Sequence, residues 1–254
     1  MFRNNPHDIS SKEVHFLKEY GPIILKNGYE PIPIKAGSKV PAVSSWQKMK
    51  ATQADIDAWA SNPSFKSVGV LTAQTPAVDI DCHDEEVSQK MIEFCEEKFG
   101  VAPKRIGLAP KNLLVYRTEI PFKKIQSPSF KDPDGKKHQV EILGQNQQFI
   151  AFGIHPNTQK PYTWIGDSIL DIPKDQLPLI TKEQAQEIVD YFVSVVPEGW
   201  REVGKGSQLI SVTSNDFLKN HKPPVDMEPY KIEQVLAQIN PDYSYDGWLK
   251  AGMG

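Results

Sequence analysis

Residues 77–84 read AVDIDCHD, a segment in which two aspartates alternate with apolar residues. Alternation with a period of two predicts a β-strand whose aspartates, Asp79 and Asp81, project from one face while its apolar side chains project from the other. Two such carboxylates lie about 7 Å apart and repel each other, so ionising both is costly unless a cation lies between them. Mg²⁺ and Mn²⁺ prefer oxygen ligands of this kind. The segment therefore indicates either a metal site or a polar strand face in water.

A third carboxylate lies in another apolar stretch, HQVEILG, which predicts a strand over residues 138–143. If this strand shares a sheet with residues 77–82, Glu141 converges with Asp79 and Asp81 on a site for two metal ions. Such a site activates a 3′-hydroxyl and neutralises a triphosphate during in-line displacement. Taken alone, Glu141 is more typical of a salt-bridge partner than of a metal ligand.

Side chains that suit phosphate groups lie in two further segments. Arg105 and Lys111 begin and end RIGLAPK, and His155 follows an expected strand over 148–153. Arginine binds phosphate as a planar fork, lysine binds it as a point charge, and an imidazole N–H donates to it. Surface solvation is the alternative for Arg105 and Lys111, and a bond to its own turn is the alternative for His155.

The rest of the chain predicts helices alternating with strands. Helical periodicity or capping signals are present in residues 11–27, 52–60, 84–100 and 181–195. Strand-like runs occupy residues 29–35, 67–72, 105–108 and 113–117. The runs 67–72 and 77–82 are joined by AQTP, which predicts a hairpin, and GQNQ at 144–147 predicts the turn before residues 148–153.

The end of the chain has a different character. Residues 197–229 lack sustained periodicity and contain KPPVDMEP, which indicates a linker. A helical segment follows Tyr230, and the chain stops inside it at WLKAGMG. We therefore expect the helical segment after Tyr230 to be the start of a further domain of a longer protein.

Composition and charge exclude several classes of protein. With glycine included, the apolar fraction is ordinary for a globular chain, and no apolar run approaches the roughly 18 residues of a membrane span. The N-terminus has no signal-peptide core, so we expect a cytoplasmic protein. Two cysteines, Cys82 and Cys95, are too few for a structural zinc site or a disulfide framework.

The net charge of −3 gives no global field that would attract nucleic acid, but the charge is unevenly distributed. Five lysines lie between residues 123 and 138, where a phosphate-binding surface and a solvated loop are both compatible with the pattern. These are Lys123, Lys124, Lys131, Lys136 and Lys137. No Walker A, GxGxxG, HExxH, CxxC or GxSxG motif is present.

Four segments occur in a fixed order along the chain, namely YEPIPIKAGSKVPAVSSW, VGVLTAQTPAVDIDCHD, VEILGQNQQFIAFGIHPNTQKPYTW and KIEQVLAQINPDYSYDGWLKAGMG. In this order they resemble the prim-pol domain (bifunctional DNA primase/polymerase) of the archaeo-eukaryotic primase superfamily, as found in phage and plasmid replication proteins. The last segment resembles the start of the helical domain that follows prim-pol modules. Together the matches cover roughly residues 20–170 and 229–254.

This resemblance implies an α+β fold, with an RRM-like mixed sheet as the catalytic module, a smaller N-terminal α/β module, and helices packed on the sheets. It implies a catalytic domain over 1–196, a linker over 197–229, and the start of a helical domain over 230–254. The implied activity is template-directed nucleotidyl transfer from NTP or dNTP to a 3′-hydroxyl, in the cytoplasm of a bacterial host cell.

The resemblance also implies roles for individual residues. It makes Asp79, Asp81 and Glu141 the catalytic ligands of two Mg²⁺ or Mn²⁺ ions, without zinc. The implied partners are a single-stranded DNA template and primer along a basic groove that includes residues 123–137, and a helicase domain in the full-length protein, with no membrane. The implied nucleotide-binding residues are Arg105, Lys111, Gln148 and His155.

One departure from the superfamily pattern concerns its Ser-x-His motif. The corresponding region, RIGLAPKNLLVYRT, contains no histidine. Lys111 or Arg105, together with His155, is predicted to take its place. The departure slightly favours an alternative, a non-catalytic replication-initiator module that binds DNA or a helicase. A metal-dependent nuclease or a glycosyl transferase that uses the aspartate pair is a third possibility.

Overall fold

The computed structural model describes residues 14–203, in which four α-helices and two β-sheets are formed. The predicted linker beyond residue 203 and the helical segment after Tyr230 lie outside the described residues. The α+β fold class is confirmed. None of the helices within residues 14–203 is long and apolar enough to cross a membrane. The helices are α1 (Phe16–Lys26), α2 (Gln53–Ala60), α3 (Glu85–Phe99) and α4 (Lys182–Val195).

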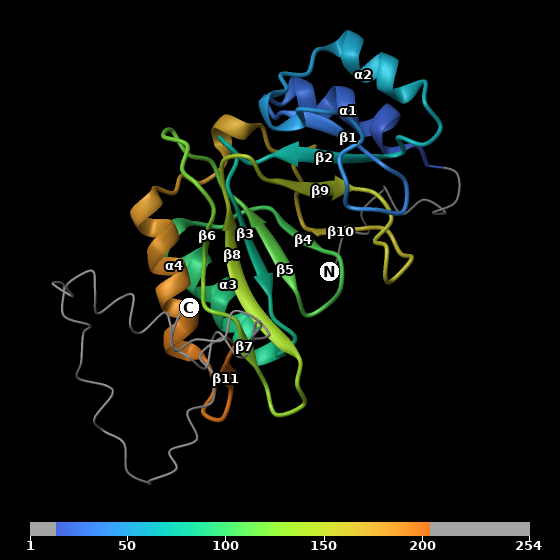
Figure 1. Ribbon diagram of the computed structural model, residues 1–254. Helices are drawn as coiled ribbons and strands as arrows, with labels where there is room; N and C mark the ends of the chain where they lie inside the picture. The colour runs from blue at the N-terminus through green and yellow to red at the C-terminus, as the bar shows by residue number, and fades with distance from the viewer. Residues whose placement is uncertain (1–13, 204–254) are drawn as a thin grey trace, which may run out of the picture. The chain divides into compact units, whose positions relative to one another are not determined.

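The larger sheet has eight strands, and its central strand β3 lies between β5 and β8 (Figure 1). The strand order is β10-β4-β5-β3-β8-β7-β11, and β6 also pairs with β8. All its strand pairs are antiparallel, whereas a mixed sheet was expected. The strands are β3 (Ala77–Asp81), β4 (Lys104–Ile106), β5 (Asn112–Val115), β6 (Ile125–Gln126), β7 (Phe130–Lys131), β8 (Lys137–Leu143), β10 (Thr163–Ile165) and β11 (Arg201–Glu202).

Helices α3 and α4 pack on one face of this sheet (Figure 1). The apolar side chains of β3, Val78 and Ile80, are fully buried in that core. Asp84 begins α3 by accepting a hydrogen bond from the Val87 N–H at 2.9 Å, and Gly100 ends it with a φ of 93°. Because successive side chains on a strand alternate, the two aspartates of β3 face away from these helices.

The smaller sheet has the order β1-β2-β9 and is also antiparallel. Its strands are β1 (Pro31–Ile34), β2 (Ser67–Leu71) and β9 (Gln148–Phe152). Helix α1 packs on one face of this sheet, over Val68 and Val70, and α2 lies against α1. The other face presents Ile34, Leu71 and Ile150.

The predicted hairpin between residues 67–72 and 77–82 is wrong. The first of these strands is β2 in the smaller sheet and the second is β3 in the larger one, so the four residues AQTP carry the chain from one sheet to the other. The turn at 144–147 makes the reverse crossing, from β8 to β9. The Thr72 hydroxyl donates to the Gly144 carbonyl at 2.6 Å and holds the two crossings together.

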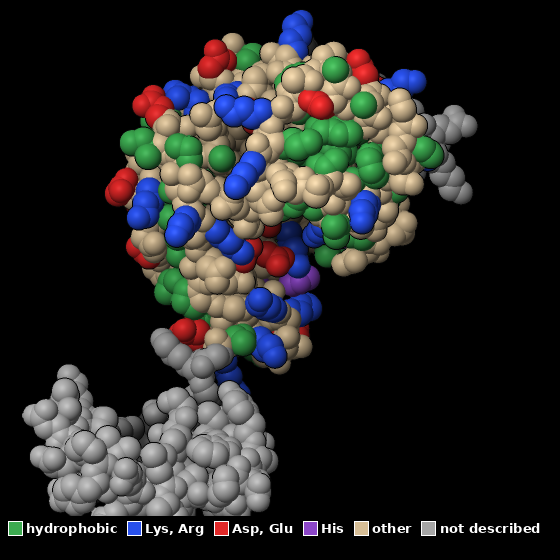
Figure 2. All heavy atoms as spheres, turned by 45° about the horizontal axis from the view of Figure 1, so that its top comes forward, with side chains coloured by type: hydrophobic (Ala, Val, Ile, Leu, Met, Phe, Trp, Pro, Cys, Tyr) green, Lys and Arg blue, Asp and Glu red, His purple; other side chains and the backbone are tan. Residues whose placement is uncertain are grey.

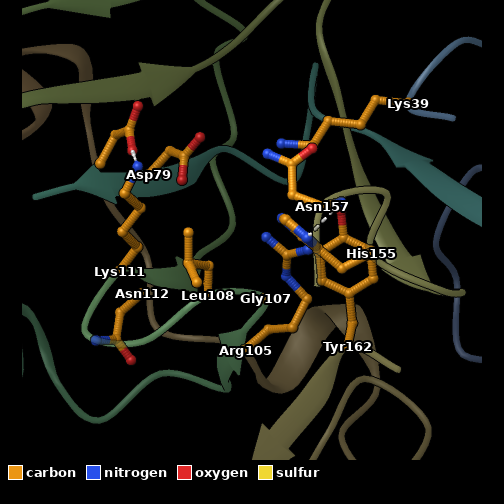
Figure 3. Close-up of a pocket in the computed structure, with 11 residues that line it drawn as sticks. Lys39, Asp79, Arg105, Gly107, Leu108, Lys111, Asn112, His155, Asn157 and Tyr162 are labelled. Atoms are coloured by element: carbon orange, nitrogen blue, oxygen red, sulfur yellow. Dashed lines mark hydrogen bonds and ion pairs between the residues drawn. The ribbon is translucent and has the colours of Figure 1, made fainter. Parts of the chain in front are cut away.

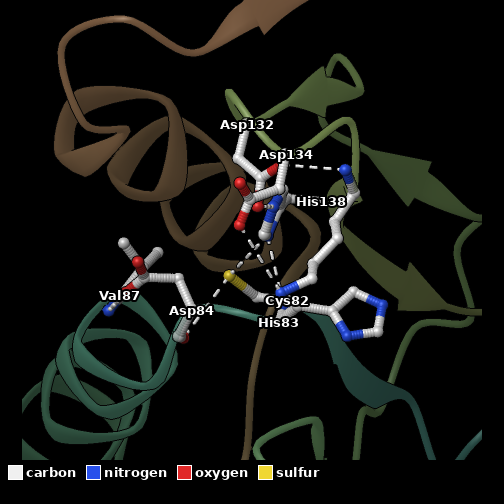
Figure 4. A network of polar contacts seen from close by, with 8 residues as sticks. Cys82, His83, Asp84, Val87, Asp132, Asp134 and His138 are labelled. Carbon is white, nitrogen blue, oxygen red and sulfur yellow. Dashed lines mark hydrogen bonds and ion pairs between the residues drawn. The ribbon is translucent and has the colours of Figure 1, made fainter.

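On the helical face of β8, a buried polar network extends the ordered fold past residue 196 (Figure 4). The His138 Nδ1 accepts a hydrogen bond from the His83 N–H at 3.2 Å, and its Nε2 lies 3.1 Å from an Asp132 carboxylate oxygen. Trp200 stacks on the same imidazole, with ring centroids 3.8 Å apart, and β11 follows at once. The segment predicted as a linker over 197–229 therefore contains a strand, β11, that pairs with β7.

Candidate functional site

A polar pocket opens on the face of the larger sheet that α3 and α4 leave uncovered. In the space-filling view the hollow brings acidic, basic and histidine side chains next to one another (Figure 2). Residues from four separate parts of the chain line it, namely Lys39, Asp79, Asp81, Arg105, Gly107, Leu108, Lys111, Asn112, His155, Asn157 and Tyr162. Five of the seven residues singled out from the sequence are in this set, and Glu141 and Gln148 are not.

The three carboxylates lie on neighbouring strands. Asp79 on β3 is directly opposite Glu141 on β8, and Asp81 is opposite Gln139. Directly opposed residues of an antiparallel pair share a face, so all three acids project from the side of the sheet that holds the pocket. Strands β3 and β8 therefore share a sheet, which is the condition under which the sequence predicted that the three acids converge.

Two of the three acids are ion-paired with lysines. The Lys111 Nζ lies 2.5 Å from the Asp81 Oδ1, and the Lys124 Nζ lies 2.7 Å from the Glu141 Oε1. Both side chains of the Lys124–Glu141 pair are largely buried, so this pair is less screened by water than an ordinary surface pair, whereas Asp81 is half exposed. Lys124 comes from the lysine-rich stretch, which the fold thus places beside the acids.

Asp79 lies at the centre of the acidic group and forms no such ion pair within residues 14–203. Burial raises the pKa of its carboxyl from 3.8 to about 6, and the Arg105 charge opposes that rise. The neighbouring charges of Asp81 and Glu141 raise the pKa further. A cation bound beside this carboxyl would stabilise its ionised form.

Arg105 lines the pocket beside His155 and Tyr162 (Figure 3). Cross-strand pairing aligns Asp79, Leu113 and Arg105 in one row, so Arg105 shares the acidic face. Its guanidinium is buried, donates through Nη1 to the Ile150 carbonyl at 2.8 Å, and lies 4.3 Å from the ring centre of Tyr162. Its Nε has no hydrogen-bond partner within the described chain. A buried guanidinium with unused donor capacity suits an anionic ligand.

His155 lies beside Arg105 and bonds its own turn as well as lining the pocket (Figure 3). Its Nδ1 accepts from the backbone N–H groups of Asn157 and Thr158, both at 3.3 Å. Burial lowers the pKa of the ring, and the charges of Lys39, Arg105 and Lys111 lower it further. The lowered pKa favours the neutral ring, and because Nδ1 accepts hydrogen bonds, the proton of that ring lies on Nε2, from which it can donate to a ligand.

A glycine makes room for this arrangement. A Cβ at Gly107 would lie 2.6 Å from Tyr162 Cε1 and 2.9 Å from His155 Cδ2. Both distances are shorter than real carbon contacts, so the ring positions depend on the missing side chain. Gly107 lies inside RIGLAPK, the segment in which the expected Ser-x-His motif is absent.

Six pocket residues were not singled out from the sequence, namely Lys39, Gly107, Leu108, Asn112, Asn157 and Tyr162. Asn157 and Tyr162 follow His155 in a segment that the sequence marked only for its histidine. Lys39 lies in YEPIPIKAGSKVPAVSSW, one of the four segments that carry the resemblance, for which the sequence predicted no residue role. Gln148 points elsewhere, because its Nε2 donates to the Lys39 carbonyl at 3.0 Å.

The donor set of this face fits a hard divalent cation. Three carboxylates on adjacent strands provide the oxygen ligands that Mg²⁺ and Mn²⁺ prefer. In the conformation of residues 14–203 no three Asp, Glu, His or Cys side chains converge closely enough to hold a metal ion. In this conformation Lys111 and Lys124 hold two of the three carboxylates in ion pairs.

A second group of polar side chains is arranged like a catalytic nucleophile and its base. It consists of Cys82, His138 and Asp132. The Cys82 Sγ lies 3.3 Å from the His138 Nδ1, and the opposite ring nitrogen faces Asp132. However, Cys82 is fully buried and burial raises the pKa of its thiol to about 11. The sulfur is therefore a protonated thiol in the core, and the network is structural.

Comparison with known proteins places the pocket within one known type of module. A family model described as "Prim-Pol: Bifunctional DNA primase/polymerase, N-terminal" matches residues 23–179. That range is more than half of the chain and contains every residue that lines the pocket. The segment at 229–254 lies outside the match. A search of curated proteins gave no match to the chain.

Proposed function

Because the chain belongs to the bifunctional DNA primase/polymerase (Prim-Pol) family, we propose that its pocket performs template-directed nucleotidyl transfer. The substrates are a nucleoside triphosphate, as NTP or dNTP, and a 3′-hydroxyl on a single-stranded DNA template, and the reaction depends on Mg²⁺ or Mn²⁺. One observation carries the proposal: an acidic wall, with Asp79 and Asp81, faces cationic groups across one pocket (Figure 3). A metal-bound triphosphate is complementary to both sides.

The acidic wall would hold the metal. Asp79, Asp81 and Glu141 are its proposed ligands, and the bound ion supplies charge neutralisation of the triphosphate and activation of the 3′-hydroxyl. For these acids to act as ligands, Lys111 and Lys124 must leave their carboxylates. Lys111 lines the pocket, so its ammonium can turn from Asp81 to a phosphate oxygen.

The opposite wall would bind the phosphates. Arg105 is held by the Ile150 carbonyl and by Tyr162, so little side-chain entropy is lost when it binds an anion. His155 donates from Nε2, as its turn requires. Phosphoryl transfer needs little covalent work from the protein, so positioning and charge stabilisation by these groups are sufficient.

The template would follow the lysine-rich edge of the same face. Lys137 lies on the same face of β8 as Glu141, and Lys131 is opposite it on β7. Lysines that follow the backbone of a single strand give salt-sensitive binding without sequence preference. Replication of phage or plasmid DNA and a helicase domain elsewhere in the protein are the proposed setting, supported by the resemblance in motif order.

The direct test is nucleotide incorporation on a single-stranded DNA template, with and without a primer, in Mg²⁺ and in Mn²⁺. The variant Asp79→Asn/Asp81→Asn keeps side-chain size and removes both charges, and we expect it to lose incorporation. Glu119→Gln, at an exposed acid that does not line the pocket, is the matched control and should incorporate normally.

Unprimed products in this assay support primase activity, and primer extension alone supports polymerase activity. Incorporation that survives the double substitution contradicts the proposal. Absence of incorporation with intact DNA binding supports the alternative of a non-catalytic replication-initiator module that binds DNA or a helicase.

A further inference from the structure

The wall opposite the catalytic acids contains a lysine that comes from the smaller sheet. Lys39 lies in the loop after β1 and lines the pocket together with Arg105 and His155. In the close-up it stands on the side of His155 and Asn157, across the pocket from Asp79 and Lys111 (Figure 3). It therefore belongs to the wall that faces a bound triphosphate.

Within residues 14–203 the Lys39 ammonium, unlike the charged groups of the other two pocket cations, forms neither an ion pair nor a hydrogen bond. Lys111 is ion-paired with Asp81, and Arg105 donates to the Ile150 carbonyl. In the same part of the chain Lys39 forms no ion pair, and its side chain is exposed. Its charge nevertheless contributes to the lowered pKa of His155, so it acts on the pocket interior. An ammonium in this position is available to an anion.

The loop that presents Lys39 is fixed by a side chain from two strands away. Gln148 on β9 donates from Nε2 to the Lys39 carbonyl at 3.0 Å, although β2 lies between β9 and β1. The amide crosses β2 at Gly69, where an added Cβ would lie only 2.8 Å from the Gln148 Oε1. A glycine at this place in the strand thus provides the passage for the glutamine.

The backbone of the loop is further held by its own hydrogen bonds. The Lys35 N–H donates to the Val40 carbonyl at 3.1 Å, and the Ala42 N–H donates to the Pro33 carbonyl at 2.8 Å. A lysine on an anchored backbone loses less entropy on binding than one on a free loop. The anchoring explains how a residue from the smaller sheet contributes to a pocket on the larger one.

We propose that Lys39 binds the phosphates of the nucleoside triphosphate, and that Gln148 positions Lys39 instead of touching the nucleotide. The inference rests on the proposed function of the pocket and adds a third phosphate-binding cation to it. It also assigns Gln148 a different role from the direct contact expected from the sequence.

The first experiment measures equilibrium binding of dATP and of dAMP to the full chain in Mg²⁺. Lys39→Met should weaken dATP binding about tenfold and affect dAMP much less, because dATP carries more phosphate charge for the ammonium to pair with. Lys39→Arg retains the charge and should restore most of the affinity. Lys35→Met, at an exposed lysine of the same loop that does not line the pocket, is the matched control and should bind like the wild type.

The second experiment separates positioning from contact. Gln148→Met keeps the side-chain length and removes the donor, and it should also weaken dATP binding. In the Lys39→Met background the same change should have no further effect on affinity, because its influence passes through Lys39. Additive losses in the double variant would overturn the positioning role. Unfolding transitions of all variants show whether any loss reflects the fold.

Different experimental results would contradict the inference and the proposed function. Wild-type protein that incorporates nucleotides while Lys39→Met binds dATP normally overturns the inference alone. Wild-type protein that neither binds dATP nor incorporates it overturns the proposed function, and the inference with it.

Discussion

Asp79 on β3 and Glu141 on β8 are directly opposed across neighbouring antiparallel strands, yet of the two only Glu141 has a lysine at ion-pair distance within residues 14–203. The central acid of the site is thus the least neutralised, and the outer acids are held by Lys111 and Lys124. The protein's own lysines thus partly neutralise a face of the sheet that suits a cation. Substituting an acid or a lysine of this face should therefore change stability or metal binding in a direction set by the charge that is removed.

Removing the charge of Asp79 should stabilise the metal-free protein. Its pKa is about 6 when folded, against an ordinary aspartate value of 3.8, so the folded state holds more proton between pH 4 and 6. Stability therefore decreases as pH rises through that window. We expect Asp79→Asn to raise the free energy of unfolding at pH 7 by about 2 to 3 kcal/mol. Urea unfolding in EDTA at pH 4 and pH 7 checks this, and an equal difference at both pH values contradicts it.

Releasing Glu141 from its lysine should strengthen metal binding. In Lys124→Met no ammonium competes for the carboxylate, so Mn²⁺ affinity should rise several-fold, measured by the loss of free Mn²⁺ signal in electron paramagnetic resonance. Lys123→Met, at the preceding lysine, is the control and should leave the affinity unchanged. A lower affinity in Lys124→Met would show that Lys124 supports the site instead of blocking it.

Filling the space at Gly107 should damage the phosphate wall without requiring a strained backbone. In Gly107→Ala the new methyl group meets the rings of Tyr162 and His155, which must move. We expect the KM for dNTP to rise about tenfold or more, since displacing a charged hydrogen-bond donor costs that much. Steady-state primer extension measures KM and kcat, and an unchanged KM is the contradicting result.

Substituting the paired lysines of β7 and β8 should change how DNA binding depends on salt. Suppose that Lys131 and Lys137 each neutralise one phosphate of a single strand. Their joint replacement by Met should then make the negative slope of log K against log salt less steep by about 1.4. Lys182→Met, on α4 at the other face of the sheet, is the control and should keep the wild-type slope. Fluorescence anisotropy with a labelled oligonucleotide at several salt concentrations provides the measurement.

Much of the local structure was predictable from the chain. The predicted helix after Asp84 is present as α3, ending before Gly100, and the helix predicted over 181–195 is present as α4. Helix α1 begins at Phe16, later than the expected residue 11, and residues before 14 lie outside the described part. Caps and periodicity act within one or two turns, so they are readable without knowledge of the partner element.

The partners of each strand were harder to predict. The apolar pattern of residues 67–72 and 77–82 specifies which faces are buried, and a short connection then favoured a hairpin. Nothing in that pattern encodes that β2 pairs with β1 and β9 while β3 pairs with β5 and β8. The same limitation hid Lys39, whose place in the pocket depends on the order of the smaller sheet.

By itself, the sequence determined that Asp79 and Asp81 share a face, because strand alternation is a local property of the backbone. It also determined the family, through the order of its motifs. Only the tertiary structure decided that Glu141 is adjacent to Asp79, that Lys111 and Lys124 neutralise the outer acids, and that Gln148 points to Lys39. These relationships depend on contacts between residues far apart in the chain, and such contacts are settled by how whole sheets pack, not by any one segment.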